Sequence, residues 1–247
     1  MPKTTPPSLS GDQDKYLPFL IEIKKRLLFV VLVFSIAAVL GFIYYEKIVI
    51  LILKLFNIPG INIVFTSPFQ FLNLAINSAF LIGTVVVFPI FLFQILAFLK
   101  PGLNSREYKT LSSLIPLSFF LFLAGFTLGI FVMKYVVSIF YEKSQNLNIG
   151  NFLDISLLLS QTLVTAAFMG IAFQFPTAAT ALIRLKVIEY KSLANQRMIA
   201  YAISIIFAAF LPPTDLLSLL LLTLPLAMLF ELTLILNKFL FKPHPSQ

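Results

Sequence analysis

The chain has 247 residues, of which 59% are hydrophobic and only 11% are charged, and its formal net charge at pH 7 is +8. A soluble domain usually carries about 25% charged residues, so this composition excludes an ordinary soluble protein and indicates an integral membrane protein. Cysteine is absent and the only histidine, His244, lies in the polar C-terminal tail, which excludes disulfides, thiol catalysis, iron–sulfur clusters and histidine-ligated haem or zinc.

The N-terminal residues 1–16 lack the apolar core of a signal peptide, and their Pro, Ser and Asp content predicts a disordered polar cytoplasmic tail. Six apolar stretches follow, with aromatic and β-branched residues on all sides. This pattern is typical of lipid-exposed helices, whereas the strands of a membrane barrel alternate over about 10 residues. We therefore predict an all-α protein with one six-helix membrane domain, 17–240, and a cytoplasmic tail, 241–247. The predicted transmembrane helices lie near 27–45, 74–98, 111–133, 157–183, 199–211 and 216–236.

Positive charge indicates the orientation of the six predicted helices. Of the 18 Lys and Arg residues, fourteen lie in the N-terminal segment, the second-to-third connection, the fourth-to-fifth connection and the C-terminus. The opposite face carries the other four: Lys47, Lys54, Lys134 and Lys143. Because short cytoplasmic loops are enriched in Lys and Arg, we expect both termini in the cytoplasm. We expect no nucleic-acid binding, since that would need the cations gathered on one soluble face.

Glu22 and Glu107 are two of the carboxylates that lie within these cationic cytoplasmic segments. Glu22 stands four residues before Arg26, a favourable spacing at the start of a helix. Glu107 has Arg106 and Lys109 close by in sequence, and either could form a surface salt bridge with it. Each carboxylate could instead accept paired hydrogen bonds from a guanidinium group, so the two could form a receptor for an arginine-bearing ligand. The spacing alone does not separate these interpretations.

Five motifs in order resemble the TatC family, the polytopic subunit of the twin-arginine protein translocase, from about residue 17 to residue 240. They are "LIEIKKRLL", "SPFQFL", "FLKPGLNSREYK", "PPTD" and "PLAMLFEL". The first is similar to the family's N-terminal signature, with Glu22 at its glutamate and Arg26 at its second arginine. The third is similar to the family's first cytoplasmic loop, with Pro101, Leu103 and Glu107 at its proline, leucine and glutamate.

The resemblance implies a receptor for folded cargo proteins that carry an N-terminal signal peptide with consecutive arginines. It implies that Glu22 and Glu107 hold these arginines, with Arg26, Pro101 and Leu103 in the same site. Partners would be single-span amphipathic subunits of the TatA and TatB kind, further copies of this chain within the complex, and a proton-motive force to drive transport. The membrane would be a bacterial inner membrane, with an organellar membrane as the alternative.

The chain departs from the family pattern at several positions. The signature histidine is Phe19 and the first arginine is Lys24, and the glutamate usual in the fourth helix is Gln174. An acid often found near Gln70 is missing, and a polar position near Leu219 is apolar. Because an unpaired amide in lipid costs several kcal/mol, we expect Gln174 to face the bundle or a cavity.

Other intramembrane residues are more typical of a scaffold than of a catalyst. Glu231 is the only carboxylate inside an apolar stretch, and it could be hydrogen-bonded or protonated within the chain or could contact a partner helix. Gly125 and Gly129 form a small-xxx-small pair, which predicts close helix packing, with a partner interface as the alternative. Kinks are expected at four prolines: Pro89, Pro116, Pro176 and Pro225.

The fifth apolar stretch is too short for a normal bilayer. Residues 198–211 span 14 positions, or about 21 Å as a helix, against a hydrocarbon core of about 30 Å. A short helix followed by an abrupt Pro-Pro turn should thin the membrane locally and expose backbone to a neighbouring helix. We therefore expect a single-span partner to dock on small or turn-forming residues of this region: Ala202, Ser204, Ala208, Pro212, Pro213 and Asp215.

Two other classes of protein are less consistent with the sequence. A small-solute secondary transporter usually has internal repeats, but residues 1–125 show no similarity to residues 126–247. An intramembrane hydrolase would need a serine with a histidine, a zinc site or paired aspartates, and Asp154 and Asp215 both lie at outer ends of helices. We therefore expect no catalytic residues, no metal and no cofactor.

Overall fold

The computed structural model describes residues 10–56, 62–64, 67, 69–147 and 152–240. Its backbone is almost entirely helical. The helices are α1 (Ser10–Ile43), α2 (Tyr45–Leu55), α3 (Gln70–Leu99), the 3-10 turn η1 (Lys100–Gly102), α4 (Ser105–Asn146), α5 (Ile155–Ala172), α6 (Phe175–Arg184), α7 (Tyr190–Asn195), α8 (Arg197–Ala209) and α9 (Leu216–Leu240). Two three-residue strands, β1 (Asn62–Val64) and β2 (Phe152–Asp154), pair in parallel with Asn62 opposite Phe152.

Within the described ranges, five helical segments are long and apolar enough to cross a membrane. These are α1 from Leu17, α3 with η1, α4, the α5–α6 pair and α9, and α8 is a shorter apolar helix. The expected six-helix class is therefore confirmed, with the short β1–β2 pair as an addition that the sequence did not predict. The third helix is much longer than expected, because α4 has 42 residues and so extends about 63 Å, twice the hydrocarbon core.

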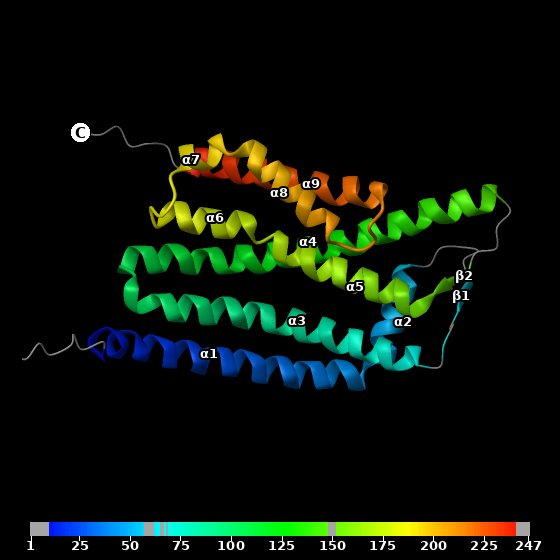
Figure 1. The fold of residues 1–247 in the computed structure, drawn as a ribbon, viewed down its shortest axis with the longest axis horizontal. Helices are drawn as coiled ribbons and strands as arrows, with labels where there is room; N and C mark the ends of the chain where they lie inside the picture. Colours follow the sequence, from blue (N-terminus) through cyan, green and yellow to red (C-terminus); the bar gives the residue numbers. More distant parts are fainter. Residues whose placement is uncertain (1–9, 57–61, 65–66, 68, 148–151, 241–247) are drawn as a thin grey trace, which may run out of the picture.

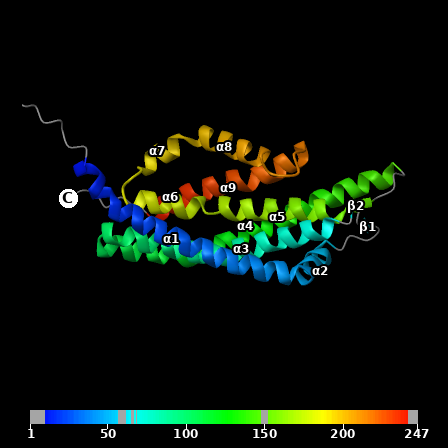
Figure 2. The same ribbon diagram turned by 60° about the horizontal axis from the view of Figure 1, so that its bottom comes forward.

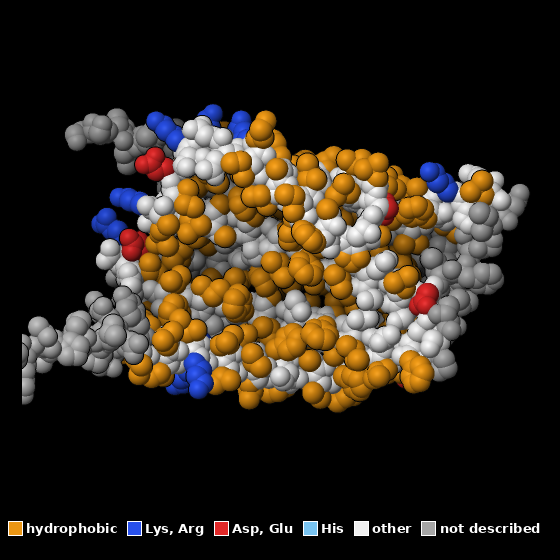
Figure 3. All heavy atoms as spheres, viewed as in Figure 1, with side chains coloured by type: hydrophobic (Ala, Val, Ile, Leu, Met, Phe, Trp, Pro, Cys, Tyr) orange, Lys and Arg blue, Asp and Glu red, His pale blue; other side chains and the backbone are white. Residues whose placement is uncertain are grey.

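The connections gather at the two ends of the bundle (Figures 1 and 2). The start of α1, η1, the α6–α7 connection and the end of α9 lie at one end, here called the η1 end. The α2 helix, the β1–β2 pair, the end of α4 and the α8–α9 turn lie at the other, here called the β end. The described Lys- and Arg-rich segments thus share the η1 end, and an apolar band separates the charged side chains near the two ends (Figure 3).

The helical region begins earlier than expected. Helix α1 starts at Ser10, so residues 10–16 of the predicted polar tail are helical, and residues 1–9 and 241–247 lie outside the described residues. The hydropathy pattern did not include residues 10–16 because only the later part of α1 is apolar.

The glycine pair of α4 packs against α5 of the same chain. A Cβ added to Gly129 would lie 2.6 Å from the Cα of Ala166, and one added to Gly125 would lie 2.5 Å from the carbonyl oxygen of Met169. Both distances are too short for any side chain, so the two helices touch through their backbones. This supports close packing within the chain and not the alternative of a partner interface.

Proline has different effects along the bundle. Pro89, Pro116 and Pro225 lie inside the continuous helices α3, α4 and α9. Only Pro176 coincides with a break, since α5 ends at Ala172 and Pro176 occupies the first turn of α6. Proline is tolerated there because N–H groups in the first turn of a helix have no intrahelical acceptor. The N–H that proline lacks therefore costs no helical hydrogen bond. The predicted fourth transmembrane helix is therefore two helices in sequence.

Two aspartates at the β end are helix caps. The Oδ1 of Asp154 accepts hydrogen bonds from the backbone N of Ser156 at 2.8 Å and of Leu157 at 3.1 Å, at the start of α5. Its Oδ2 accepts one at 2.5 Å from the side-chain amide of Gln70 on α3. Asp215 caps α9 in the same way, accepting from the backbone N of Ser218 at 2.9 Å. Capping satisfies backbone donors at a helix start, so a structural role explains both aspartates.

Candidate functional site

Glu107 is held at the start of α4 by a reciprocal cap. Its Oε2 accepts a hydrogen bond from the backbone N of Asn104 at 2.9 Å, while the Asn104 side chain accepts one from the backbone N of Glu107. This arrangement is a capping box, which satisfies backbone donors that the first helical turn leaves without partners. The side chain is half-buried, and its Oε1 has no hydrogen-bond partner among the described residues. One carboxylate oxygen is therefore committed to the fold and the other is available to a ligand.

The residues before Glu107 fix the path of the loop. Pro101 lies in η1, which ends the α3 segment, and Leu103 has an extended backbone with φ −107° and ψ 141°. The Leu103 side chain packs against a small apolar cluster of Leu96, Leu111 and Leu114, which joins α3 to α4. The tight turn and this anchor explain why a proline and a leucine precede the glutamate in this connection.

A pocket of about 460 Å³ opens beside Glu107 at the η1 end. It lies between the start of α4 and the end of α6, and its lining residues are Arg106, Glu107, Thr110, Leu111, Arg184, Leu185 and Lys186. Three cations thus surround one carboxylate. In the sequence, Arg184 and Lys186 are only topology signals, because nothing in the spacing places the end of the fourth helix beside the first loop.

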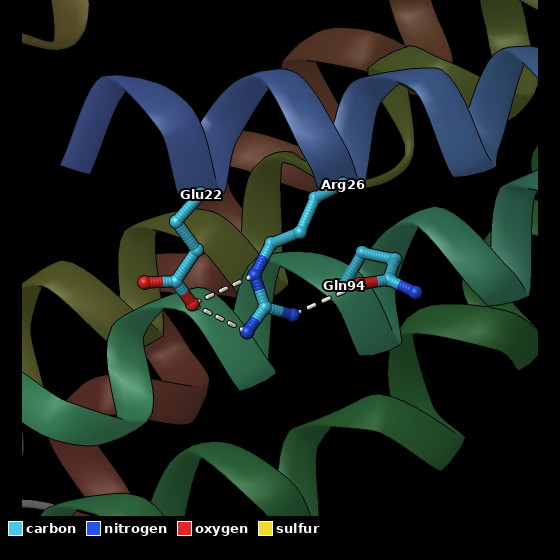
Figure 4. A network of polar contacts seen from close by, with 3 residues as sticks. All are labelled: Glu22, Arg26 and Gln94. Carbon is cyan, nitrogen blue, oxygen red and sulfur yellow. Dashed lines mark hydrogen bonds and ion pairs between the residues drawn. The ribbon is translucent and has the colours of Figure 1, made fainter. Parts of the chain in front are cut away.

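Glu22 and Arg26 form the pair that their spacing predicted (Figure 4). The Nε and Nη2 atoms of Arg26 donate to Oε1 of Glu22 at 3.0 and 2.6 Å. The Nη1 atom donates to the side-chain oxygen of Gln94 on α3 at 2.9 Å, so Arg26 bridges the two helices. Gln94 was missed in the sequence, although it is a polar residue in the apolar run "IFLFQILAF", the same signal that drew attention to Gln174.

The five predicted signal-peptide residues all lie towards the η1 end, on α1, on η1, in the η1–α4 connection and at the start of α4. Within the described residues no hydrogen bond or ion pair joins Glu22 to Glu107. A ligand that uses both carboxylates must therefore span from α1 to the α3–α4 connection. The Glu22 side chain is 37% exposed even while paired with Arg26, so it remains accessible to such a ligand.

Gln174 faces the bundle, as its polarity predicted. The Oγ of Ser118 on α4 donates to its side-chain oxygen, and its amide nitrogen donates to the carbonyl oxygens of Ser118 at 3.2 Å and of Gly170 at 3.3 Å. Its hydrogen-bonding groups are therefore satisfied within the chain. At this position a neutral amide binds α4 to the break between α5 and α6.

Glu231 joins α9 to α8. Its Oε1 accepts a hydrogen bond from the hydroxyl of Tyr201 at 2.5 Å and lies 3.2 Å from the Nε of Arg197. Of the two interpretations made from the sequence, the hydrogen-bonded residue within the chain agrees with these contacts. The polar contact with a partner helix is not needed to explain this carboxylate.

The α8 region differs from its predicted role in two respects. Ala208 is only 2% exposed and packs in a core cluster with Met169 and Leu222, so it faces the chain's own bundle and not a partner. The carbonyl oxygen of Pro212 accepts a hydrogen bond from the Oγ1 of Thr165 on α5, so this part of the Pro212–Pro213 turn is satisfied internally. The sequence could not place either contact because both join α8 or its turn to the distant α5.

The remaining face of α8 is open. Ala202 is exposed, and Ser204 lines an apolar pocket of about 340 Å³ between α8, α9 and the α5–α6 break. Helix α8 has 13 residues, about 20 Å, which agrees with the prediction that it is too short for a normal bilayer. The pocket is lined mainly by apolar side chains, among them Phe175, Ile199, Ile203, Phe207, Leu226 and Phe230.

Known proteins of similar sequence identify the family of this chain. The family Sec-independent protein translocase protein (TatC) matches residues 18–225. The chain is 32% identical over 233 residues to the TatCy protein of Bacillus subtilis, covering 92% of this chain and 90% of the relative. It is 30% identical over 223 residues to TatC of Listeria innocua, covering 88% of this chain and 89% of the relative.

A solved structure has a similar fold. A crystal structure of the twin arginine translocase receptor TatC in DDM has a TM-score of 0.79 at 25% identity, and the match covers 89% of this chain and 99% of that chain. The apolar helices, their order and the family match all point to the same conclusion. The chain belongs to the TatC family and is a multi-pass inner-membrane component of the Sec-independent protein translocase.

Proposed function

We propose that this protein is the receptor subunit of its translocase and binds twin-arginine signal peptides of folded cargo at the η1 end, which faces the cytoplasm with both termini. The observation that carries this proposal is the carboxylate of Glu107. Its capping box fixes one oxygen and leaves Oε1 without a partner among the described residues, beside an open pocket. A fixed, half-exposed carboxylate loses little entropy when it accepts paired hydrogen bonds from a guanidinium group.

Glu22 supplies the second carboxylate of the proposed site. Its Oε1 already accepts two hydrogen bonds from Arg26, and Arg26 is held in turn by Gln94. A peptide arginine therefore binds the other oxygen of Glu22, while Arg26 holds the carboxylate in a fixed orientation. Pro101 and Leu103 fix the path of the α3–α4 connection, which leads into Glu107. The consecutive arginines then distinguish cargo from other basic peptides, because lysine cannot make the paired contacts.

Photo-crosslinking tests this assignment directly. A photoreactive residue at Ser105, which is exposed at the start of α4, should couple to a twin-arginine signal peptide presented to the full chain in membranes. A peptide with two lysines in place of the arginines is expected to couple much less. The matched control is the same photoreactive residue at Leu147, exposed at the β end. Equal coupling of the two peptides at Ser105, or coupling at Leu147 alone, would show that the receptor site lies elsewhere.

Single-span amphipathic subunits of the TatA and TatB kind dock on the open face of α8 and the turn that leads to α9, and further copies of this chain join the same complex. The docking face comprises Ala202, Ser204, Pro213 and the outer end at Pro212 and Asp215, without the buried Ala208. Packing must hold such a pair together, because lipid tails are as apolar as the side chains of α8. The proton-motive force then drives transport through the assembled complex.

Cysteine coupling tests the docking face, since the native chain contains no cysteine. Cysteines at Ala202 and at Ile206, which is 57% exposed, should form disulfides with a cysteine in a partner helix. A cysteine at the buried Ala208 should not, and Ser204→Leu should weaken coupling because it fills the pocket beside α9. A cysteine at Phe131 on α4, which is 60% exposed, is the comparison. If this cysteine couples while those on α8 do not, the partner docks on α4 and not on α8.

A further inference from the structure

The pocket beside Glu107 is lined by more cations than acids, and the binding of peptide arginines does not explain this excess. Arg106 comes from α4, and Arg184 and Lys186 come from the end of α6, whereas Glu107 is the only acid in the lining. Neither Arg106 nor Lys186 has an ion-pair partner among the described residues. This pocket, here called the mouth, therefore has a net positive charge in its lining and lies at the η1 end of the bundle.

An apolar groove continues from this mouth along the bundle. Leu111 lines both the mouth and a groove of about 210 Å³ between α3, α4 and α6. The groove walls are almost entirely aliphatic and include Leu92, Leu114 and Ala178, and Ser118 lies at its far end. From Arg106 to Ser118 helix α4 rises about 18 Å, close to the depth of one leaflet, about 15 Å. A charged mouth above an apolar groove of this length has the proportions of one lipid molecule.

The backbone at Lys186 supports a role for its charge. Helix α6 ends in a Schellman motif, in which the backbone N of Lys186 donates to the Ile183 carbonyl and that of Val187 to the Leu182 carbonyl, both at 3.0 Å. Lys186 occupies the left-handed position of this motif, with φ 58°, where glycine is favoured. A lysine there costs about 1 kcal/mol relative to glycine. The chain therefore keeps a cation in the mouth at some cost in backbone conformation.

We propose that the mouth and groove bind one anionic phospholipid, with its phosphate among Arg106, Arg184 and Lys186 and one acyl chain along the groove. Basic pockets between transmembrane helices at a membrane surface recognise anionic head groups. A zwitterionic lipid is disfavoured because it brings a further cation next to three others. A free anion would use the mouth but not the aliphatic groove. This site does not depend on peptide binding by Glu107, and its test contains no peptide.

The test uses the full chain in nanodiscs that contain equal amounts of phosphatidylglycerol and phosphatidylcholine. After mild detergent extraction, mass spectrometry measures the ratio of the two lipids that remain bound. The native chain should retain several times more phosphatidylglycerol, since each Lys or Arg near an anionic head group contributes a factor of about 5 in affinity. The double variant Arg106→Gln with Lys186→Gln should lose most of this preference. Equal retention of both lipids by the native chain would overturn the proposal.

Three further variants distinguish loss of the lipid site from a general loss of charge or of stability. Lys134→Gln with Lys143→Gln removes two cations at the β end and should leave the ratio unchanged. Lys186→Gly should lower the preference about fivefold while raising the melting temperature, because glycine suits the backbone at φ 58°. Ala178→Phe, on the exposed side of α6, should fill the groove and also lower the ratio. An unchanged ratio in Lys186→Gly would contradict phosphate binding in the mouth. An unchanged ratio in Ala178→Phe would contradict binding of an acyl chain in the groove.

Discussion

Replacing Glu107 by glutamine is expected to weaken binding of a twin-arginine signal peptide by about 10- to 100-fold, the effect of losing one charge-assisted pair of hydrogen bonds at a half-buried site. Glutamine can still accept the hydrogen bond from the backbone N of Asn104, because a capping box works with Glu or Gln. The substitution therefore removes the charge and keeps the helix start. Fluorescence anisotropy of a labelled peptide with the purified full chain measures the change.

Two controls make the Glu107→Gln result specific. Glu142→Gln removes an exposed acid at the opposite end of the same helix and should leave peptide affinity unchanged. Glu107→Ala removes both the charge and the cap, so it should lower peptide affinity and also reduce the melting temperature. Binding of the native chain should weaken as salt rises, because the site is open to water. Full peptide affinity in Glu107→Gln would remove this carboxylate from the receptor site.

Replacing Gly129 by alanine should destabilise the bundle, although glycine-to-alanine changes inside a helix normally stabilise it by up to about 1 kcal/mol. The added Cβ would lie 2.6 Å from the Cα of Ala166 and 3.0 Å from its backbone N, so α4 and α5 must move apart. Overpacking of this kind costs about 1–3 kcal/mol, which outweighs the gain in helix propensity. Gly129→Leu should be worse and should prevent accumulation of the folded chain.

Thermal unfolding of the detergent-solubilised protein, followed by loss of monodisperse material, measures this effect. The matched control is Gly102→Ala, which makes the same chemical change in η1, where an added Cβ meets nothing within 4 Å. Gly102→Ala should keep the native melting temperature, while Gly129→Ala lowers it. If both alanine variants melt at the native temperature, the α4–α5 contact is looser than the backbone distance indicates.

Some features of this protein follow from sequence because they depend on local chemistry. Long apolar stretches must be helices, since backbone groups in lipid can be satisfied within a helix and not in an open strand. The Glu22–Arg26 pair is four residues apart on one helix, so the spacing predicted it and the structure has it. Gln174 faces the bundle because an amide left in lipid is costly, and its contacts with Ser118 agree.

Other features were decided by tertiary structure alone. The sequence of α8 does not distinguish which of its small residues packs inward, because lipid tails are as apolar as a protein core. By sequence alone, Ala208 is as suitable for contact with a partner as Ala202. In the fold, Ala208 is buried because α8 packs on α5 and α9. The Thr165 contact with Pro212 likewise joins segments that only the fold brings together.

The same distinction holds at the η1 end. Sequence determined that Glu107 lies in a cationic connection, because charged residues cannot enter the hydrocarbon core cheaply and so gather at helix ends. Only the fold brings Arg184 and Lys186 beside Arg106 and Glu107, and only the fold places Gln94 against Arg26. Local composition determines how far each helix can extend through the membrane, whereas these side-chain contacts join different helices and depend on how the helices pack.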